Sequence, residues 1–278
     1  MKKINFVLAL MIVVVIGLTG CGTDSSTPAP QGNDAAQGSE TQDGKQVENV
    51  DKAYVVGTNA AFAPFEWVDD KGEVQGFDMD ITKAIAEAVG IQVEFKNTAW
   101  DSIFVGLNNG ESDLLASGVT ITEQRKQSFD FTESYFVAEQ FIVVPEGTSV
   151  KTLQDLKDKE IGVLITSTGD IVVSEAFGQD SKQIHRYDTV PLALMDLVNG
   201  EVDAVVADNA VVLHFLKNNP NYKLELIEDE TMETEEYGLV VKKGDQELLD
   251  KLNQGLQIIK ENGTYDTIYE SYFGTAAK

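Results

Sequence analysis

An α/β fold with two similar lobes is predicted by the order of apolar and amphipathic segments along the chain. From residue 53 onward, short apolar runs alternate with segments whose apolar residues recur every three to four positions. Such alternation is typical of a mainly parallel sheet with helices on both faces. The pattern Asn-Gly-Glu-x-Asp occurs at 109–113 and again at 199–203, each time between a helical segment and an apolar run. We therefore expect one structural unit to be used once in each lobe.

The first half begins with a predicted strand at 53–59 and a predicted helix at 80–90. Apolar residues of that helix, including Ile81 and Ile85, recur on one face, and Asp80 is placed to cap its start. A glycine follows at position 90, where it would end the helix.

The pattern continues with a strand at 91–97, a helix at 99–110 and a strand at 113–119. Thr122 is then expected to cap a short helix that contains Arg125. The second half repeats this order. Its predicted segments are a strand, glycine-bearing turn and helix within 160–178, and a helix, strand, loop and helix within 191–219.

The N-terminal 50 residues are expected to lie outside the folded body. Two lysines and an apolar run at 6–18 predict a signal peptide at 1–20, because the run is shorter than the roughly 20 residues that cross a bilayer. Cys21 is the single cysteine, and the residues before it resemble the lipobox of bacterial lipoproteins, in which this cysteine carries lipid. Residues 21–50 are rich in small and polar residues and predict a disordered tether.

Composition narrows the class of function. The chain has 46 acidic and 21 basic residues and a net charge of −25, so phosphate-rich partners such as nucleic acids would be repelled. Beyond position 50 there is no cysteine, no cluster of metal ligands and no glycine-rich phosphate motif, so we expect neither a metal nor a cofactor. Of the two histidines, His214 lies in an apolar helical segment, where a packed or surface-exposed side chain is commoner than a catalytic one.

Six segments, taken together and in order, resemble the polar amino-acid-binding proteins of bacterial ABC importers. They are VGTNAAFAPFEW (56–67), GFDMDITKAIA (76–86), SGVTITEQR (117–125), FDFTESYF (129–136), VDAVVADNA (202–210) and NGTYDTIYESYFG (262–274). The resemblance implies a type II periplasmic-binding fold with crossover segments near 135–139 and 233–237. Lobe 1 would then hold 51–135 and 238–278, lobe 2 would hold 139–233, and the ligand would lie in the cleft between them.

The resemblance also implies a clamp for the two charges of a free amino acid. Arg125 would hold the carboxylate, because a guanidinium can donate two parallel hydrogen bonds to it. Thr120 and the helix start at Thr168 would assist. Asp208, with the hydroxyl of Thr120 and the carbonyl of Gly118, would receive the ammonium. The local sequence alone favours the commoner roles, a solvated residue for Arg125 and a helix cap for Asp208; the resemblance reverses that preference.

The same resemblance places Phe62 and Trp100 on either side of the ligand side chain. Aromatic faces attract cations, which suits a basic amino acid, and the segment at 208–229 is most similar to the basic-amino-acid branch. Three residues are expected near the ligand side chain: Asn59, Ser117 and Ile165. Four others are candidates for a further polar contact with it: Glu66, Asp101, Glu139 and Gln140. Basic-ligand binders often have an acid where Asn59 stands, and glutamine binders a lysine where Ile165 stands.

We expect a monomeric, non-enzymatic binding lipoprotein on the extracytoplasmic face of a membrane, anchored through Cys21 and serving an ABC permease. Its ligand is expected to be a polar L-amino acid, with arginine, lysine or histidine favoured. The alternatives are a glutamine or cystine binder, an enzyme similar to cyclohexadienyl dehydratases, and the ligand-binding domain of a sensor.

Overall fold

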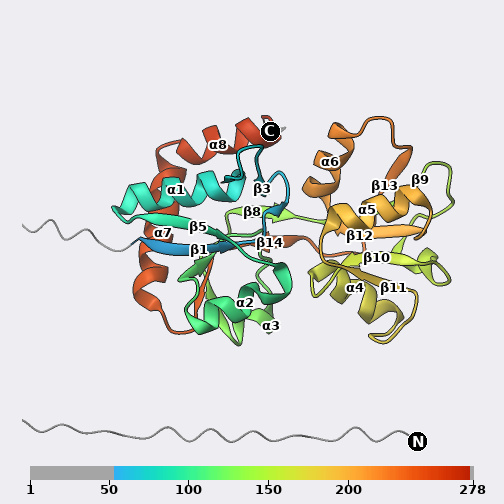
Figure 1. Ribbon diagram of the computed structural model, residues 1–278, viewed down its shortest axis with the longest axis horizontal. Coiled ribbons are helices and arrows are strands. Elements are labelled where there is room, and N and C mark those ends of the chain that lie inside the picture. Colours follow the sequence, from blue (N-terminus) through green and yellow to red (C-terminus); the bar gives the residue numbers. More distant parts are fainter. Residues whose placement is uncertain (1–52, 276–278) are drawn as a thin grey trace, which may run out of the picture. The chain divides into compact units, whose positions relative to one another are not determined.

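A computed structural model describes residues 53–275 (Figure 1). The predicted signal peptide, the predicted tether and the predicted lipid-carrying Cys21 lie outside the described residues. Within 53–275, two five-stranded sheets are present together with two smaller sheets.

The first five-stranded sheet has the strand order β5-β1-β6-β15-β7. Strand β1 runs parallel to both of its neighbours, whereas β15 is antiparallel to β6 and β7. The strands are β1 (Tyr54–Thr58), β5 (Val93–Asn97), β6 (Leu114–Leu115), β7 (Phe129–Phe131) and β15 (Val240–Lys242). We call the part of the protein built on this sheet lobe 1. It joins two stretches of chain that are far apart in sequence.

The second five-stranded sheet has the strand order β11-β10-β12-β9-β13. Strand β10 runs parallel to β11 and β12, and β9 is antiparallel to β12 and β13. The strands are β9 (Gln140–Pro145), β10 (Ile161–Leu164), β11 (Ile184–Tyr187), β12 (Ala204–Asp208) and β13 (Leu224–Glu228). We call the part built on this sheet lobe 2. Its strands come from one continuous stretch of chain.

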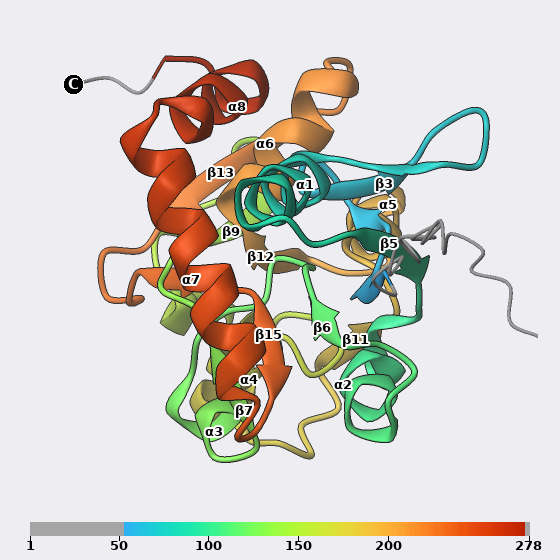
Figure 2. The same ribbon diagram turned by 90° about the vertical axis from the view of Figure 1, so that its left-hand side faces the viewer.

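Helices cover both faces of each sheet, as the alternating pattern predicts. In lobe 1, α1 and α8 lie on one face and α2 and α3 on the other, and Figure 2 shows α7 in front of the sheet, where it packs against α1. In lobe 2, α5 and α6 lie opposite α4. The helices are α1 (Phe77–Val89), α2 (Trp100–Asn109), α3 (Glu123–Lys126), α4 (Thr168–Phe177), α5 (Val190–Asn199), α6 (Asn209–Asn218), α7 (Gln246–Glu261), α8 (Thr264–Phe273) and the 3-10 helix η1 (Leu153–Leu156).

The inner strands lie between these helix layers, and most of their residues are buried. Every residue of β10 and β12 is buried, which explains why both strands are almost wholly apolar in sequence. No helix within 53–275 combines the length and the apolar character that crossing a bilayer requires.

Two local predictions need correction. Helix α1 begins at Phe77 with Gly76 at its cap, so the prediction that Asp80 caps it is wrong. The helix extends one turn further because Phe77 and Asp78 are both fully buried and belong to its packed face. The predicted strand at 113–119 is also shorter than expected, since only Leu114–Leu115 pairs with neighbours before the chain turns into the site.

The duplicated Asn-Gly-Glu-x-Asp segments have the same geometry, which confirms the predicted structural repeat. Gly110 ends α2 with φ 80° and ψ 22°, and Gly200 ends α5 with φ 79° and ψ 19°. The carboxylates of Asp113 and Asp203 then accept bonds of 2.8 and 3.0 Å from backbone N–H groups near the starts of β1 and β10. The two-lobe α/β fold predicted from the sequence is confirmed.

Two small sheets connect and line the lobes. Strands β8 (Phe136–Ala138) and β14 (Glu235–Tyr237) pair antiparallel where the chain passes between the two large sheets. Strands β2 (Ala61–Phe62), β3 (Glu66–Val68) and β4 (Val74–Gln75) form the connection between β1 and α1. The turns that follow β6, β10 and β12 face the space between the lobes, where ligands of α/β folds are commonly bound.

Candidate functional site

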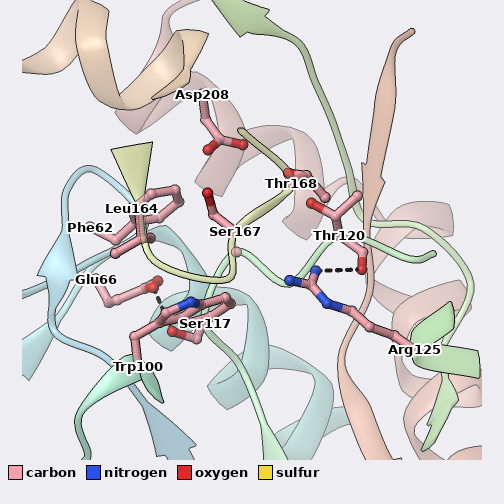
Figure 3. A pocket seen from close by; sticks show the side chains of 11 residues that line it. Phe62, Glu66, Trp100, Ser117, Thr120, Arg125, Leu164, Ser167, Thr168 and Asp208 are labelled. Carbon is pink, nitrogen blue, oxygen red and sulfur yellow. Dashed lines mark hydrogen bonds between the residues drawn. The ribbon is translucent and has the colours of Figure 1, made fainter. Parts of the chain in front are cut away.

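A small cavity with about 20 Å³ of free space lies between the lobes (Figure 3). Its walls come from the ends of β10 and β12 and from the segments that follow β1, β5, β6 and β10. The residues lining it are Phe62, Glu66, Trp100, Ser117, Gly118, Thr120, Arg125, Leu164, Ser167, Thr168 and Asp208. The structure therefore brings together eight of the nine residues predicted for ligand binding, the exception being Asn59.

Arg125 enters the cavity from the short helix α3. Thr122 caps that helix as predicted, its hydroxyl accepting a bond of 3.1 Å from the N–H of residue 125. The guanidinium donates to the carbonyl of Thr120 at 2.9 Å and to that of Thr166, in lobe 2, at 3.5 Å. It also lies 5.7 Å from the ring of Trp100. These contacts fix the group while leaving further N–H donors for a bound anion.

The charge of this guanidinium is opposed by burial and supported by nearby acids. Burial lowers the pKa of Arg125, and Glu235 and Asp208 act in the opposite direction. Since arginine begins with a pKa far above neutrality, the group stays cationic and can hold a carboxylate.

Gly118 sets the course of the turn that follows β6. Its φ of 52° is in the left-handed region, and a Cβ at this position would lie 2.8 Å from the ring of Phe62. Its N–H donates to the carboxylate of Asp78 at 2.8 Å. A side chain at this position would therefore strain the backbone and press against the cavity wall.

Asp208 ends β12 and faces the cavity from lobe 2. The residue is 6% exposed, and its carboxyl group accepts a hydrogen bond from the hydroxyl of Tyr237 on β14. Burial, followed by repulsion from Glu235, raises the pKa of Asp208 to about 7. A cation placed beside this carboxyl would favour its ionised form.

The start of α4 forms the part of the wall nearest to Thr120. The hydroxyl of Ser167 caps the helix by accepting from the N–H of Asp170 at 3.2 Å, and Thr168 follows directly. Thr166 has a φ of 55°, unusual for a threonine, and its N–H donates to the carboxylate of Asp170 at 2.9 Å. Asp170 in turn pairs with Arg186 at 2.9 Å, which holds the turn in place.

Glu66 is a cavity residue that the sequence indicated only as one of four candidates for a polar contact. Its side chain is fully buried and accepts a 2.9 Å bond from the hydroxyl of Ser117 (Figure 3). Asp78 lies beside it, also fully buried, and accepts from the hydroxyl of Tyr135 at 2.7 Å. Burial and then Asp78 raise the pKa of Glu66 well above its usual range, and burial raises the pKa of Asp78 to about 7.

Each of these two carboxyl groups has one oxygen, Oε2 of Glu66 and Oδ1 of Asp78, for which no donor exists among the described side chains. One proton shared between two neighbouring carboxyl groups satisfies both oxygens. A proton between Glu66 and Asp78 is therefore consistent with their burial and with the direction of both pKa shifts.

Two residues predicted near the ligand contribute through their backbones. The N–H of Asn59 donates to the hydroxyl of Ser117 at 2.9 Å, and its amide group donates to the carbonyl of Thr98 at 3.0 Å, away from the cavity. The carbonyl of Ile165 accepts from the indole of Trp100 at 3.0 Å, a bond that joins the lobes. Leu164 and Ser167 also line the cavity and were not anticipated.

Among residues 53–275 there is no group of three or more side chains that could hold a metal ion. Both histidines lie elsewhere, His185 beside Glu160 and His214 near the ring of Trp67. The cavity is instead defined by opposite charges, hydroxyl groups and two aromatic walls.

Comparison with known families agrees with this arrangement. The family model for bacterial extracellular solute-binding proteins, family 3, matches residues 54–275. The chain belongs to this family. As a family 3 solute-binding protein it shares the two-lobe fold of solved relatives.

Similar proteins include several named for basic amino acids. A "probable histidine-binding protein" of Neisseria gonorrhoeae is 42% identical over 100% of this chain and 99% of its own length. An "L-arginine-binding protein" of Pseudomonas aeruginosa is 34% identical over 80% of this chain and 88% of its own. The solved structure of the "arginine-, lysine-, histidine-binding protein ArtJ" of Geobacillus stearothermophilus is 44% identical, with a TM-score of 0.78 over 82% of this chain and 97% of that one.

Proposed function

We propose that this protein captures a basic L-amino acid outside the cell and delivers it to the permease of an ABC importer. The observation that carries the proposal is the arrangement of charge around one cavity. Arg125 comes from lobe 1, Asp208 from lobe 2, and Glu66 lies with the aromatic walls. An amino acid with a cationic side chain carries one anion and two cations. These match in sign Arg125, Asp208 and the Glu66–Asp78 pair, because two carboxyl groups that share one proton carry one negative charge together.

In the proposed complex, the ligand carboxylate binds the guanidinium of Arg125 and the free N–H groups at the start of α4 near Thr168. The ammonium binds Asp208, with the hydroxyl of Thr120 and the carbonyl of Gly118 as further acceptors. Both charges are then paired inside a site that excludes much of the solvent, which offsets the cost of desolvating them.

The ligand side chain would run between Phe62 and Trp100 toward Glu66. Figure 3 has these three residues on one side of the cavity and Arg125 with the threonines on the other. Of the four polar candidates named from the sequence, Glu66 alone lines the cavity, while Gln140 bonds to Thr168 from behind it. A carboxyl group at this end favours a cationic side chain over a neutral one, in keeping with the names of the similar proteins.

We propose binding rather than catalysis for this cavity, because its charged groups match those of an amino acid in sign and because similar proteins are named for amino-acid binding. A turnover assay with prephenate or arogenate tests the enzymatic alternative, and product formation would contradict the proposal. We further propose that the mature chain is a monomer anchored through lipid on Cys21, with 21–50 as tether. Mass spectrometry of a C21S variant, which should lack the lipid, tests the anchor.

The boundaries of the lobes also remain a proposal: 51–135 with 238–278 for lobe 1, 139–233 for lobe 2. The pairing of β8 with β14 supports crossovers between them. Closure of the lobes about these crossovers would be driven by the higher affinity of the closed state for the ligand.

A thermal-shift screen of the twenty amino acids, with ornithine, citrulline and cystine added, tests the ligand class. A ligand that binds only the folded state stabilises it by about 2.7 kcal/mol at a concentration of 100 Kd. We expect arginine, lysine, histidine and ornithine to raise the unfolding temperature. Citrulline is the matched control, since it has nearly the shape of arginine without the charge, and we expect it to have a much smaller effect. Stabilisation by glutamine or cystine alone would contradict the basic-ligand assignment.

A further inference from the structure

Glu235, on the crossover strand β14, contacts both lobes at the edge of the cavity. One oxygen of its carboxylate, Oε2, accepts a 2.7 Å bond from the hydroxyl of Thr120 and a 2.8 Å bond from the hydroxyl of Thr168. Thr120 belongs to the turn after β6 in lobe 1, and Thr168 begins α4 in lobe 2. A single carboxylate therefore receives one hydroxyl from each side of the cleft.

These two bonds determine whether each hydroxyl can donate or accept a further hydrogen bond. A threonine hydroxyl has one proton to donate and two lone pairs that accept. With both protons directed at Glu235, the hydroxyls of Thr120 and Thr168 have only lone pairs left for other partners. One lone pair of Thr168 accepts from the amide of Gln140 at 3.3 Å. Both threonines line the cavity, so they meet a ligand there as acceptors.

Strand β14 is itself fastened to lobe 1, which gives Glu235 a defined position. Thr120 and Tyr237 form a β-bridge, and the N–H of Ile121 donates to the carbonyl of Glu236 at 2.7 Å. From the same strand, the hydroxyl of Tyr237 donates to Asp208. The strand thus orients three polar side chains of the cavity, two hydroxyls through Glu235 and one carboxylate through Tyr237.

We propose that Glu235 is a positioning residue for ammonium recognition: by taking the protons of two threonine hydroxyls, it makes both of them acceptors for the ligand ammonium beside Asp208. Without Glu235 the hydroxyls can rotate and donate to the ligand carboxylate instead, so the cavity loses its preference for the orientation of the zwitterion. The charges that face Glu235 are Arg125 and Asp208. The inference rests on the proposed capture of an amino acid.

A double-mutant cycle measured by calorimetry with L-arginine tests the proposal, using wild type, E235A, T168V and the double variant in the full chain. We expect E235A to weaken binding about tenfold, which is the usual consequence of losing a hydrogen bond to a charged group. If Glu235 acts through Thr168, the double variant should be weakened by clearly less than the product of the two single factors. E235Q should recover part of the loss, because its amide oxygen still accepts a hydroxyl proton.

The matched control is E236A, since Glu236 is the neighbouring exposed glutamate on the same strand. Its affinity should stay within about twofold of wild type. Multiplicative effects of E235A and T168V, or an unchanged affinity in E235A, would overturn the proposal. If circular dichroism shows that E235A does not fold, the double-mutant cycle is measured with E235Q instead. Multiplicative effects of E235Q and T168V would then overturn the proposal. A wild-type chain that binds no amino acid would instead refute the proposed function, and this inference with it.

Discussion

The two lobes share one framework and differ in the turns attached to it. Strands β5-β1-β6-β15 of lobe 1 correspond in order and direction to β11-β10-β12-β9 of lobe 2, and the turns at Gly110 and Gly200 have the same geometry. After β6, however, the chain turns at Gly118 and continues to α3, which carries Arg125. After β12, Asp208 leads directly into α6.

This difference teaches how one framework supplies two complementary half-sites. The sheets fix where each strand ends, and the short segments that follow determine which charge is presented there. Lobe 1 contributes the cation of the proposed clamp and lobe 2 the anion. Neither lobe alone provides both charged groups of the proposed clamp, so binding is expected to depend on closure.

Removing the cation of lobe 1 should have the largest effect. We expect R125A to weaken L-arginine binding by on the order of 100-fold or more, because the ligand carboxylate would be buried without its bidentate partner. Calorimetry measures the affinity, and circular dichroism checks the fold. K126A is the matched control, since Lys126 is the next residue of α3 and pairs with Glu123 at the surface. Near-normal affinity in R125A would contradict the clamp.

Removing the anion of lobe 2 should have a large but smaller effect. We expect D208N to weaken L-arginine binding by roughly 10- to 100-fold, because asparagine keeps an oxygen that can accept from the ammonium and from Tyr237 while losing the charge. The same calorimetric titration measures it. An affinity for D208N equal to that of wild type would mean that lobe 2 does not provide the anion of the clamp. The two lobes would then not supply complementary half-sites.

Stability in the absence of ligand should fall as pH rises, and more of this dependence should come from lobe 1. Burial raises the pKa of Glu66, and raises those of Asp78 and Asp208 to about 7. Between about pH 4 and pH 7 the folded protein therefore holds protons that the unfolded chain has released. The stability that these protons contribute is fully present below about pH 4 and is lost as pH rises through about 7.

Urea unfolding at a series of pH values measures this slope. E66Q should make the dependence of the unfolding free energy on pH shallower, because it removes one member of the carboxyl pair in lobe 1. D208N should also make it shallower, because it removes the buried carboxyl group of lobe 2. Carboxyl groups with a lowered pKa, such as Asp130 with Lys243, contribute the opposite dependence at more acidic pH. A flat stability between about pH 5 and pH 7 in wild type would rule out protonation of the buried acids.

Replacing the glycine that ends the repeated helix should have the smallest effect on stability, and this effect should be the same in both lobes. Alanine at Gly110 or at Gly200 would adopt a left-handed conformation that costs about 1 kcal/mol. An added Cβ meets only the flexible end of Lys242 at the first position and nothing within 4 Å at the second. We expect equal losses of unfolding free energy in urea. Losses that differ by more than about 1 kcal/mol would show that the two turns are not energetically equivalent.

Much of the framework was accessible from the sequence because it follows local rules. Periodicity and glycine signals predicted α1, α2 and α5. The resemblance to amino-acid-binding proteins implied that Arg125 and Asp208 would face the same cleft, in agreement with the rule that ligands bind beyond the ends of parallel strands. The start of α1 was predicted wrongly, since burial of Phe77 outweighed the capping preference of Asp80.

The parts that were not predicted depend on contacts between distant segments. Glu66 lies on a three-residue strand, too short to show a period, and its partner Asp78 lies on α1. Glu235 reaches Thr120 across 115 positions of sequence, through a crossover strand with no pattern of its own. Such pairings are decided by tertiary packing, so a single sequence contains no local signal for them.

The position of β15 sets an order in which the lobes can be completed. All strands of lobe 2 are contained within 140–228, whereas the sheet of lobe 1 has β15, at 240–242, inserted between β6 and β7. As the chain lengthens from its N-terminus, lobe 2 gains every strand it needs while lobe 1 still has a gap in its sheet. The lobe that begins the fold is therefore the last to close, and a chain truncated before residue 240 would contain a complete lobe 2 beside an unfinished lobe 1.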